Sequence, residues 1–284
     1  MLFGEAKSLV GVVSEPDSAP ETTRPGVILL NAGVLHRVGP NRVHVRLARS
    51  LAEAGFLSLR FDLSGLGDSR PRRGRASFVR TMVAEVREAM DALATTRGVQ
   101  SFVLAGICSG ADNALRAAVE DERVAGAVLI ETYTVPSRGF TLYSYRHKLL
   151  NPVSWWRLLR GRSELLSRDR PSPPPASPRV PSTAPTAPPP EPLTDSVLPS
   201  AQVLVESVGR LVDRGTRLCF VYAATSPAYF NYRVLLRSPL RRASAGQVHV
   251  EVLDRTDHVF TPRDVQQRFV DAIRSWCVRL PTRD

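Results

Sequence analysis

The chain has 284 residues, 43% of them apolar, which is enough for one large α/β domain or two small ones. Its apolar runs are far shorter than the roughly 20 residues that cross a bilayer, which excludes a protein built of membrane-spanning helices. The formal net charge of +11 is carried by basic residues that are spread along the chain without interleaved aromatics. We therefore expect no nucleic-acid partner.

The cysteines and the first residues indicate a compartment. Cys108, Cys219 and Cys277 are odd in number and widely spaced, which argues against a disulfide framework and against a cysteine-based zinc site. The first residues include Glu5 and Lys7 and lack the long apolar core of a signal peptide. We therefore expect a cytoplasmic protein.

The chain begins with segments that alternate between strand and loop. Residues 3–13 allow a first strand or hairpin, and the polar stretch 15–25 predicts a turn region. The continuous apolar run at 26–31 is typical of a strand that is buried on both faces of a parallel sheet. After a loop at 32–42, apolar residues recur at helical spacing until Gly55 ends the helix.

The next segments continue as strand, helix, strand, helix and strand. The apolar patterns predict strands at 56–62, 101–105 and 124–131, and helices from Phe78 to about Gly98 and from Ala111 to Val119. Strands and helices that alternate at this spacing imply right-handed crossovers. We therefore expect a mostly parallel sheet with helices on both faces.

This alternation stops after Tyr133. Residues 133–215 predict a lid insertion, within which 168–199 is so rich in proline that we expect it to be disordered or polyproline-like. This proline-rich stretch is either a tether or a ligand for a proline-binding module, and we favour the tether because no recognition spacing repeats. The core domain is then expected to comprise 1–132 and 216–284. The remaining pattern predicts a helix at 197–212, strands at 218–222 and 248–253, and a closing helix from Val265 to Trp276.

The segment Gly106-Ile107-Cys108-Ser109-Gly110 joins a predicted strand to a predicted helix and has the form of a nucleophile elbow. Its small flanking residues let strand and helix approach closely around a strained central residue. Backbone N–H groups and the positive end of a helix dipole favour a thiolate there. We therefore interpret Cys108 as a nucleophile, with a buried structural cysteine as the alternative.

Further candidates follow other predicted strands, where ligands bind in an open parallel sheet. The N–H group of Ala32 or Gly33, together with that of Ser109, is suited to stabilise an oxyanion. His258 follows the last strand and is suited to take and return a proton. His36 lies beside the oxyanion loop and either contacts substrate or fixes the loop by a hydrogen bond.

One aspartate directly precedes the glycine-rich turn at 63–69 and another lies within it. We expect Asp62 and Asp68 to form backbone hydrogen bonds in this turn rather than to bind a metal. The other histidines show no ligand spacing, so neither a metal nor a cofactor is predicted.

Four stretches together resemble the α/β-hydrolase family: Leu30 to Gly33, Arg60 to Ser69, Gly106 to Gly110 and Asp257 to Phe260. The resemblance implies an α/β-hydrolase fold with a mostly parallel sheet, helices on both faces and a lid insertion. It also implies that Cys108 is the nucleophile and His258 the base. Ser109 and either Ala32 or Gly33 would form the oxyanion hole.

The chain departs from the family pattern in two places. The family usually carries serine at the elbow, whereas cysteine suits thioester, lactone or acyl-transfer chemistry. The family's acid usually follows the strand that ends here at Tyr222, where this chain has Ser226. Some members place the acid one strand earlier, so Glu131 is the candidate acid, with Asp254 and Asp257 behind it. The alternative is that Glu131 is a solvated carboxylate at the end of a strand.

These residues lead us to expect an esterase or thioesterase that forms an acyl-cysteine on a small-molecule or carrier-bound acyl substrate. An acyltransferase of the same fold stays open, because the sequence does not say whether water or another nucleophile accepts the acyl group. A catalytically impaired, hydrolase-like binding or accessory protein is the other alternative, motivated by Ser226.

Overall fold

Eight strands form one sheet in the computed structural model, which describes residues 1–17, 23–72, 76–132 and 200–281. The strands are β1 (Leu2–Phe3), β2 (Leu9–Ser14), β3 (Gly26–Leu30), β4 (Ser58–Phe61), β5 (Phe102–Ile107), β6 (Val124–Ile130), β7 (Arg217–Ala223) and β8 (Val248–Leu253). Their order across the sheet is β1-β2-β4-β3-β5-β6-β7-β8. β2 pairs antiparallel with β1 and with β4, and all pairs from β4 to β8 are parallel.

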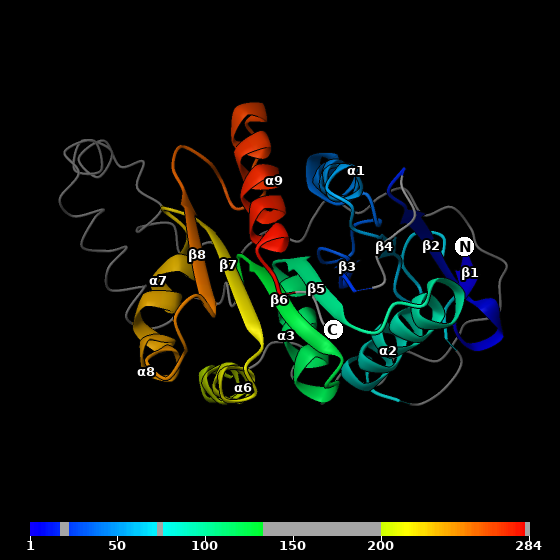
Figure 1. Cartoon of the computed structure of the whole chain (residues 1–284), viewed down its shortest axis with the longest axis horizontal. Coiled ribbons are helices and arrows are strands. Elements are labelled where there is room, and N and C mark those ends of the chain that lie inside the picture. The colour runs from blue at the N-terminus through cyan, green and yellow to red at the C-terminus, as the bar shows by residue number, and fades with distance from the viewer. Residues whose placement is uncertain (18–22, 73–75, 133–199, 282–284) are drawn as a thin grey trace, which may run out of the picture. The chain divides into compact units, whose positions relative to one another are not determined.

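Helices cover both faces of this sheet. The α-helices are α1 (Val43–Glu53), α2 (Phe78–Arg97), α3 (Ser109–Glu120), α6 (Ala201–Asp213), α7 (Pro227–Leu235), α8 (Arg237–Leu240) and α9 (Arg263–Val278). In Figure 1, α1 and α9 lie on one face, and α2, α3 and α6 lie on the other. Single 3-10 turns occur at Glu5–Lys7 and Pro40–Arg42. None of the described helices is long and apolar enough to span a membrane.

The side chains of each central strand alternate between two apolar clusters. In β5, Phe102 and Leu104 belong to the cluster beneath α2, α3 and α6, whereas Val103 and Ala105 belong to the cluster beneath α1 and α9. Every residue of β3 and β5 is buried. This burial on both faces explains why these strands read as continuous apolar runs, and it confirms the predicted fold class.

Two helices after β7 were not predicted from the apolar pattern. α7 begins after Ser226, whose side chain accepts a hydrogen bond from Tyr229 N–H, and Pro227 is its first residue. A serine cap followed by proline is a helix-start signal that the sequence contains. α8 is a single turn that follows directly.

The predicted insertion at 133–215 lies largely outside the described residues, and so does its proline-rich part at 168–199. The end of that range forms α6, which packs against α3. Leu204, Val208 and Leu211 of α6 join the apolar cluster on that face of the sheet. Within the described residues, α6 is therefore one of the layer of helices that covers the sheet.

Candidate active site

Cys108 lies on a strained turn between β5 and α3. Its backbone angles are φ 56° and ψ −122°, in a region that costs a residue with a side chain of order 1–3 kcal/mol. A Cβ atom on Gly106 would lie 2.2 Å from the carbonyl oxygen of Gly110. A Cβ atom on Gly110 would lie 2.4 Å from the carbonyl oxygen of Asn31. The turn therefore has the backbone geometry that the elbow interpretation predicts, and both glycines are required by close approach.

The Cys108 side chain is half-buried at the N-terminus of α3. Its backbone N–H donates to the carbonyl oxygen of Ile130 at 2.8 Å, which ties the elbow to the end of β6. The N–H groups in the first turn of a helix have no partner within the helix, and the helix dipole places positive potential there. An oxyanion at this point is therefore stabilised.

Ser109 connects the elbow to the loop that follows β3. Its Oγ accepts a hydrogen bond from the backbone N–H of Gly33 at 2.8 Å, so this N–H is already engaged. The backbone N–H groups of Ala32 and Ser109 make no hydrogen bond within the described part of the chain. Of the three predicted oxyanion donors, these two are open to a ligand. The role of the Ser109 side chain was not foreseen from the sequence.

A buried charge network holds the loop between β3 and α1. Asp62 is fully buried and accepts hydrogen bonds from the side chain of Asn31 at 3.0 Å and from the backbone N–H of Arg37 at 2.6 Å. The Arg37 guanidinium pairs with this carboxylate and with that of Asp68 at 2.7 Å. Asn31 also donates to the carbonyl oxygen of Leu35 at 2.8 Å. The predicted backbone hydrogen bonding is confirmed for Asp62, whereas Asp68 pairs with side chains.

His36 lies on the same loop and is half-exposed. Its Nε2 atom lies 3.3 Å from an oxygen of Asp68 and 2.8 Å from a guanidinium nitrogen of Arg37. These contacts favour the loop-fixing role among the two alternatives for His36. The ligand-capable atoms of His36, Asp62 and Asp68 lie close together, but the Arg37 guanidinium already supplies a positive charge to both carboxylates. The group therefore does not need a metal ion for neutralisation.

Glu131 follows β6 and is fully buried, so the solvated alternative for this carboxylate is wrong. Its Oε1 accepts a hydrogen bond from the backbone N–H of Ala223, at the end of β7, at 2.5 Å. Burial raises the pKa of Glu131 to about 7, although hydrogen bonds with Ala223 and Ser226 oppose the shift. Its Oε2 is enclosed and has no hydrogen-bond partner of ordinary geometry in the described part of the chain. The site therefore holds a buried carboxyl group with one oxygen that lacks a hydrogen bond of ordinary geometry in the described residues.

Ser226, which occupies the position expected for the acid, supports both α7 and Glu131. Its Oγ accepts the backbone N–H of Tyr229 at 3.1 Å. It also lies close enough to Glu131 to lower the pKa of that carboxyl group. A hydroxyl can accept one hydrogen bond and donate another, so Ser226 can serve both neighbours.

His258 lies on the loop between β8 and α9, and its side chain is exposed. The carbonyl oxygen of the next residue, Val259, accepts a hydrogen bond from Asn41 at 3.3 Å, so the loop reaches back to the region after β3. Phe260 is fully buried and packs against Phe269 with 4.8 Å between ring centroids, which anchors the loop. Within the described residues, the imidazole makes no hydrogen bond to Cys108 or to any carboxylate.

The two further candidates for the acid, Asp254 and Asp257, lie on this same loop. Asp254 is exposed. Asp257 accepts hydrogen bonds from Thr261 N–H at 3.0 Å, from the Thr261 hydroxyl at 2.7 Å and from Val259 N–H at 3.3 Å. Burial opposes the effect, but these hydrogen bonds lower the pKa of Asp257. Asp257 therefore stabilises the loop that carries His258.

The candidates follow neighbouring strands in order. Cys108, Glu131, Ser226 and His258 come after β5, β6, β7 and β8. Neighbouring strands lie about 4.8 Å apart, so the sheet itself brings the first three close together. The His258 ring has to be brought in by its loop, because β8 lies roughly 14 Å from β5.

Comparisons with known proteins agree on the fold. The family described as serine aminopeptidase S33 matches residues 27–172. No curated protein matches the sequence. Similar solved structures include Est1E from Butyrivibrio proteoclasticus, at 11% identity and a TM-score of 0.58, which covers 99% of this chain and 98% of that one. Dienelactone hydrolase from Anabaena variabilis is 13% identical, with a TM-score of 0.54, over 94% of this chain and 90% of that one. Monoacylglycerol lipase from Paleococcus ferrophilus is 16% identical, with a TM-score of 0.53, over 96% and 99%. At these identities the structures share the fold alone.

Proposed function

Since the chain belongs to the serine aminopeptidase S33 family of α/β hydrolases, we propose that this hydrolase cleaves an ester or thioester through an acyl-cysteine intermediate on Cys108. One observation carries the proposal. The strained backbone of Cys108, closed in by Gly106 and Gly110, holds the thiol at the N-terminus of α3. A buried structural cysteine has no need of such a conformation, because packing alone does not repay backbone strain.

The chemistry of sulfur favours esters and thioesters as substrates. A thiolate is a strong nucleophile at neutral pH, and an ion pair with histidine activates it with less help from a third residue than serine needs. When the leaving group is also a thiol, the bond that forms and the bond that breaks are chemically alike. Acyl transfer to Cys108 from a thioester is therefore close to balanced in energy.

The proposed reaction has two steps. His258 takes the proton from the Cys108 thiol, the sulfur attacks the carbonyl carbon, and the leaving group departs with the proton returned by His258. Water then attacks the acyl-cysteine while His258 accepts its proton, which releases the carboxylic acid and restores the thiol. In both steps the negative oxygen is held by the backbone N–H groups of Ala32 and Ser109, which are open in the described residues.

Glu131 is the proposed orienting acid. Within the described residues its buried Oε2 has no hydrogen-bond partner of ordinary geometry, and such an atom is a suitable acceptor for the ring N–H of His258 once the β8–α9 loop brings the ring inward. A neighbouring imidazolium would favour the ionised carboxyl group and so oppose the effect of burial on its pKa. With Glu131 as the proposed acid, Ser226 at the usual acid position no longer argues for an impaired accessory protein.

The loop after β3 indicates an apolar acyl group. Val34 and Leu35 are 83% and 46% exposed on this loop, next to the oxyanion donors. Exposed apolar side chains at the mouth of a site gain from covering an apolar ligand. A small-molecule or carrier-bound acyl substrate meets this requirement.

The proposal is tested by turnover of a substrate panel. We would measure kcat/KM for p-nitrophenyl acyl esters, acyl thioesters and an aminoacyl p-nitroanilide, with the wild type and Cys108→Ala. We expect turnover of the esters or thioesters and a loss of roughly a thousandfold or more in Cys108→Ala. Retention of that turnover in Cys108→Ala would refute the acyl-cysteine mechanism, and preference for the anilide would refute the substrate class.

Labelling by iodoacetamide provides a second readout that does not depend on the substrate. We expect fast labelling of Cys108 near neutral pH and far slower labelling in His258→Ala, because the thiolate loses its ion-pair partner. Cys219→Ser is the matched control, since this thiol is fully buried and burial raises its pKa well above the ordinary value. Equal and slow labelling of the wild type and His258→Ala would remove the proposed base.

A further inference from the structure

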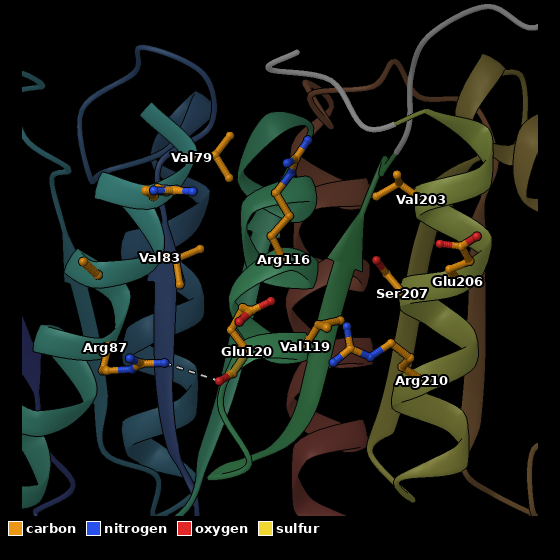
Figure 2. A pocket seen from close by; sticks show the side chains of 12 residues that line it. Val79, Val83, Arg87, Arg116, Val119, Glu120, Val203, Glu206, Ser207 and Arg210 are labelled. Carbon is orange, nitrogen blue, oxygen red and sulfur yellow. Dashed lines mark hydrogen bonds between the residues drawn. The ribbon is translucent and has the colours of Figure 1, made fainter. Parts of the chain in front are cut away.

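A groove of about 570 Å³ lies on the helical face formed by α2, α3 and α6. α3 forms its floor and the other two helices form its walls, as Figure 2 shows. The lining residues are Val79, Arg80, Val83, Ala84, Arg87, Arg116, Val119, Glu120, Val203, Glu206, Ser207 and Arg210. The proposed reaction uses none of these side chains, so the groove is a separate feature of the molecule.

The groove combines an apolar stripe with an excess of positive charge. Four valines line it, and Val203 is 43% exposed. Four arginines and two glutamates line it, and one of the arginines, Arg87, also pairs with Asp121 at 3.6 Å. Within the described residues, neither the Arg80 nor the Arg210 side chain forms a hydrogen bond or an ion pair, and both are exposed. Such a surface suits a partner that is both acidic and apolar.

The spacing of the charges matches a helix. On the α2 wall, Arg80 and Arg87 are seven residues apart with Val83 between them, so all three lie on one face and the charges are separated by roughly 10 Å. A second helix lying along α2 meets this pattern with acidic residues seven positions apart and apolar residues between them.

The floor and the opposite wall, formed by α3 and α6, also carry arginines. Figure 2 shows Arg87 and Arg210 reaching into the same end of the groove from opposite walls, near Glu120 and Val119. The Arg87 guanidinium also donates to the carbonyl oxygen of Glu120 at 3.3 Å, which fixes its direction. The Arg116 side chain extends toward the opposite end of the groove. Positive groups therefore stand at both ends of an apolar centre.

From this arrangement we propose that the groove docks an acidic amphipathic helix of a partner protein. The valine stripe buries the apolar residues of the partner helix, and Arg80 and Arg210 pair with its acidic residues. Because Arg116 follows Cys108 by eight residues along α3, a docked partner would lie about 12 Å from the elbow. A continuous phosphate backbone fits less well, since it leaves the valines without apolar contact.

The test is direct binding of a synthetic helical peptide to the full-length protein. The probe is a fluorescent peptide of about 18 residues with glutamates seven positions apart and leucines between them, measured by anisotropy at roughly 150 mM salt. We expect saturable binding that weakens roughly tenfold or more in Arg80→Glu/Arg210→Glu. The matched control is Arg46→Glu/Arg268→Glu, a double charge reversal at exposed positions of α1 and α9, which we expect to change binding less than about twofold.

The outcomes separate the proposal from its competitors. Equal weakening in both charge-reversal variants would show general attraction to a basic protein, and equal binding of a peptide with serines in place of the leucines would show an anion site without apolar docking; either result overturns the proposal. A dimer in sedimentation experiments that Arg80→Glu/Arg210→Glu disperses would assign the groove to a second copy instead. Cys108→Ala should bind the peptide as the wild type does, so this test stands or fails apart from the hydrolase mechanism.

Discussion

Replacing Glu131 by glutamine removes a buried acid while keeping nearly the same shape. The amide oxygen of the glutamine can still accept the hydrogen bond that Ala223 N–H gives to Glu131. The substitution therefore leaves the local packing in place and takes away only the titration of the carboxyl group. This makes Glu131→Gln a selective perturbation of the charge.

The magnitude follows from the pKa. The ordinary value for the carboxyl group is 4.5, and in the folded protein burial raises the pKa of Glu131 to about 7. Between these values the folded protein keeps a proton that the unfolded chain has released, so the free energy of unfolding falls as pH rises through this window. The gap corresponds to about 3 kcal/mol, which is fully lost above pH 7. The discount for solvent screening is small, because the side chain is fully buried.

Urea unfolding of wild type and Glu131→Gln, followed by circular dichroism from pH 4.5 to about 8, measures this effect. The difference between the two proteins cancels the titration of all other groups. We expect it to change by about 3 kcal/mol in favour of the variant as pH rises, while kcat/KM of the variant falls. A stability difference that does not change with pH would refute the assignment of a buried, titrating Glu131.

Three further substitutions test the surrounding geometry. Gly106→Ala should lower the free energy of unfolding by about 3 kcal/mol, because its Cβ would lie 2.2 Å from a backbone oxygen. Gly65→Ala should cost only about 1 kcal/mol, because its Cβ would meet no atom within 4 Å and only the φ of +78° is unfavourable. Thermal unfolding measures both costs. Arg37→Ala leaves the fully buried charge of Asp62 without its cation and should cost about 3 kcal/mol in urea unfolding; a cost near zero would contradict the network. Ser109→Ala removes the acceptor of the Gly33 N–H and should lower kcat/KM about fivefold, while the free energy of unfolding changes by less than about 1 kcal/mol. A variant with wild-type kcat/KM would show that this hydrogen bond does not position the oxyanion donors.

The elements that the sequence predicts well are those whose signal is local. The buried runs of β3 and β5 and the spacing of Gly106 and Gly110 around Cys108 depend on neighbours in the chain, and the fold class follows from their alternation. α7 carried a local signal as well, in Ser226 followed by Pro227, but its nine residues are too short a stretch for a clear helical repeat.

The features that the sequence leaves open depend on contacts between distant segments. Glu131 is buried because the end of β7 closes over it, so its pKa and its unused oxygen cannot be inferred from the residues beside it. Arg37 hydrogen-bonds to Asp62, which is 25 residues away in the sequence, and Gly33 hydrogen-bonds to Ser109, which is 76 residues away. The arginine groove arises only when α2, α3 and α6 pack together. Sequence periodicity carries no information about such pairings.

The proposed reaction depends on Cys108 as the carrier of the acyl group. It is tested most directly by intact-mass spectrometry of protein that is quenched in acid after exposure to acyl thioesters and activated esters. We expect a mass increase equal to one acyl group, located on the peptide that contains Cys108 and absent in Cys108→Ala. Substrate turnover without any adduct, or an adduct that persists in Cys108→Ala, would contradict it.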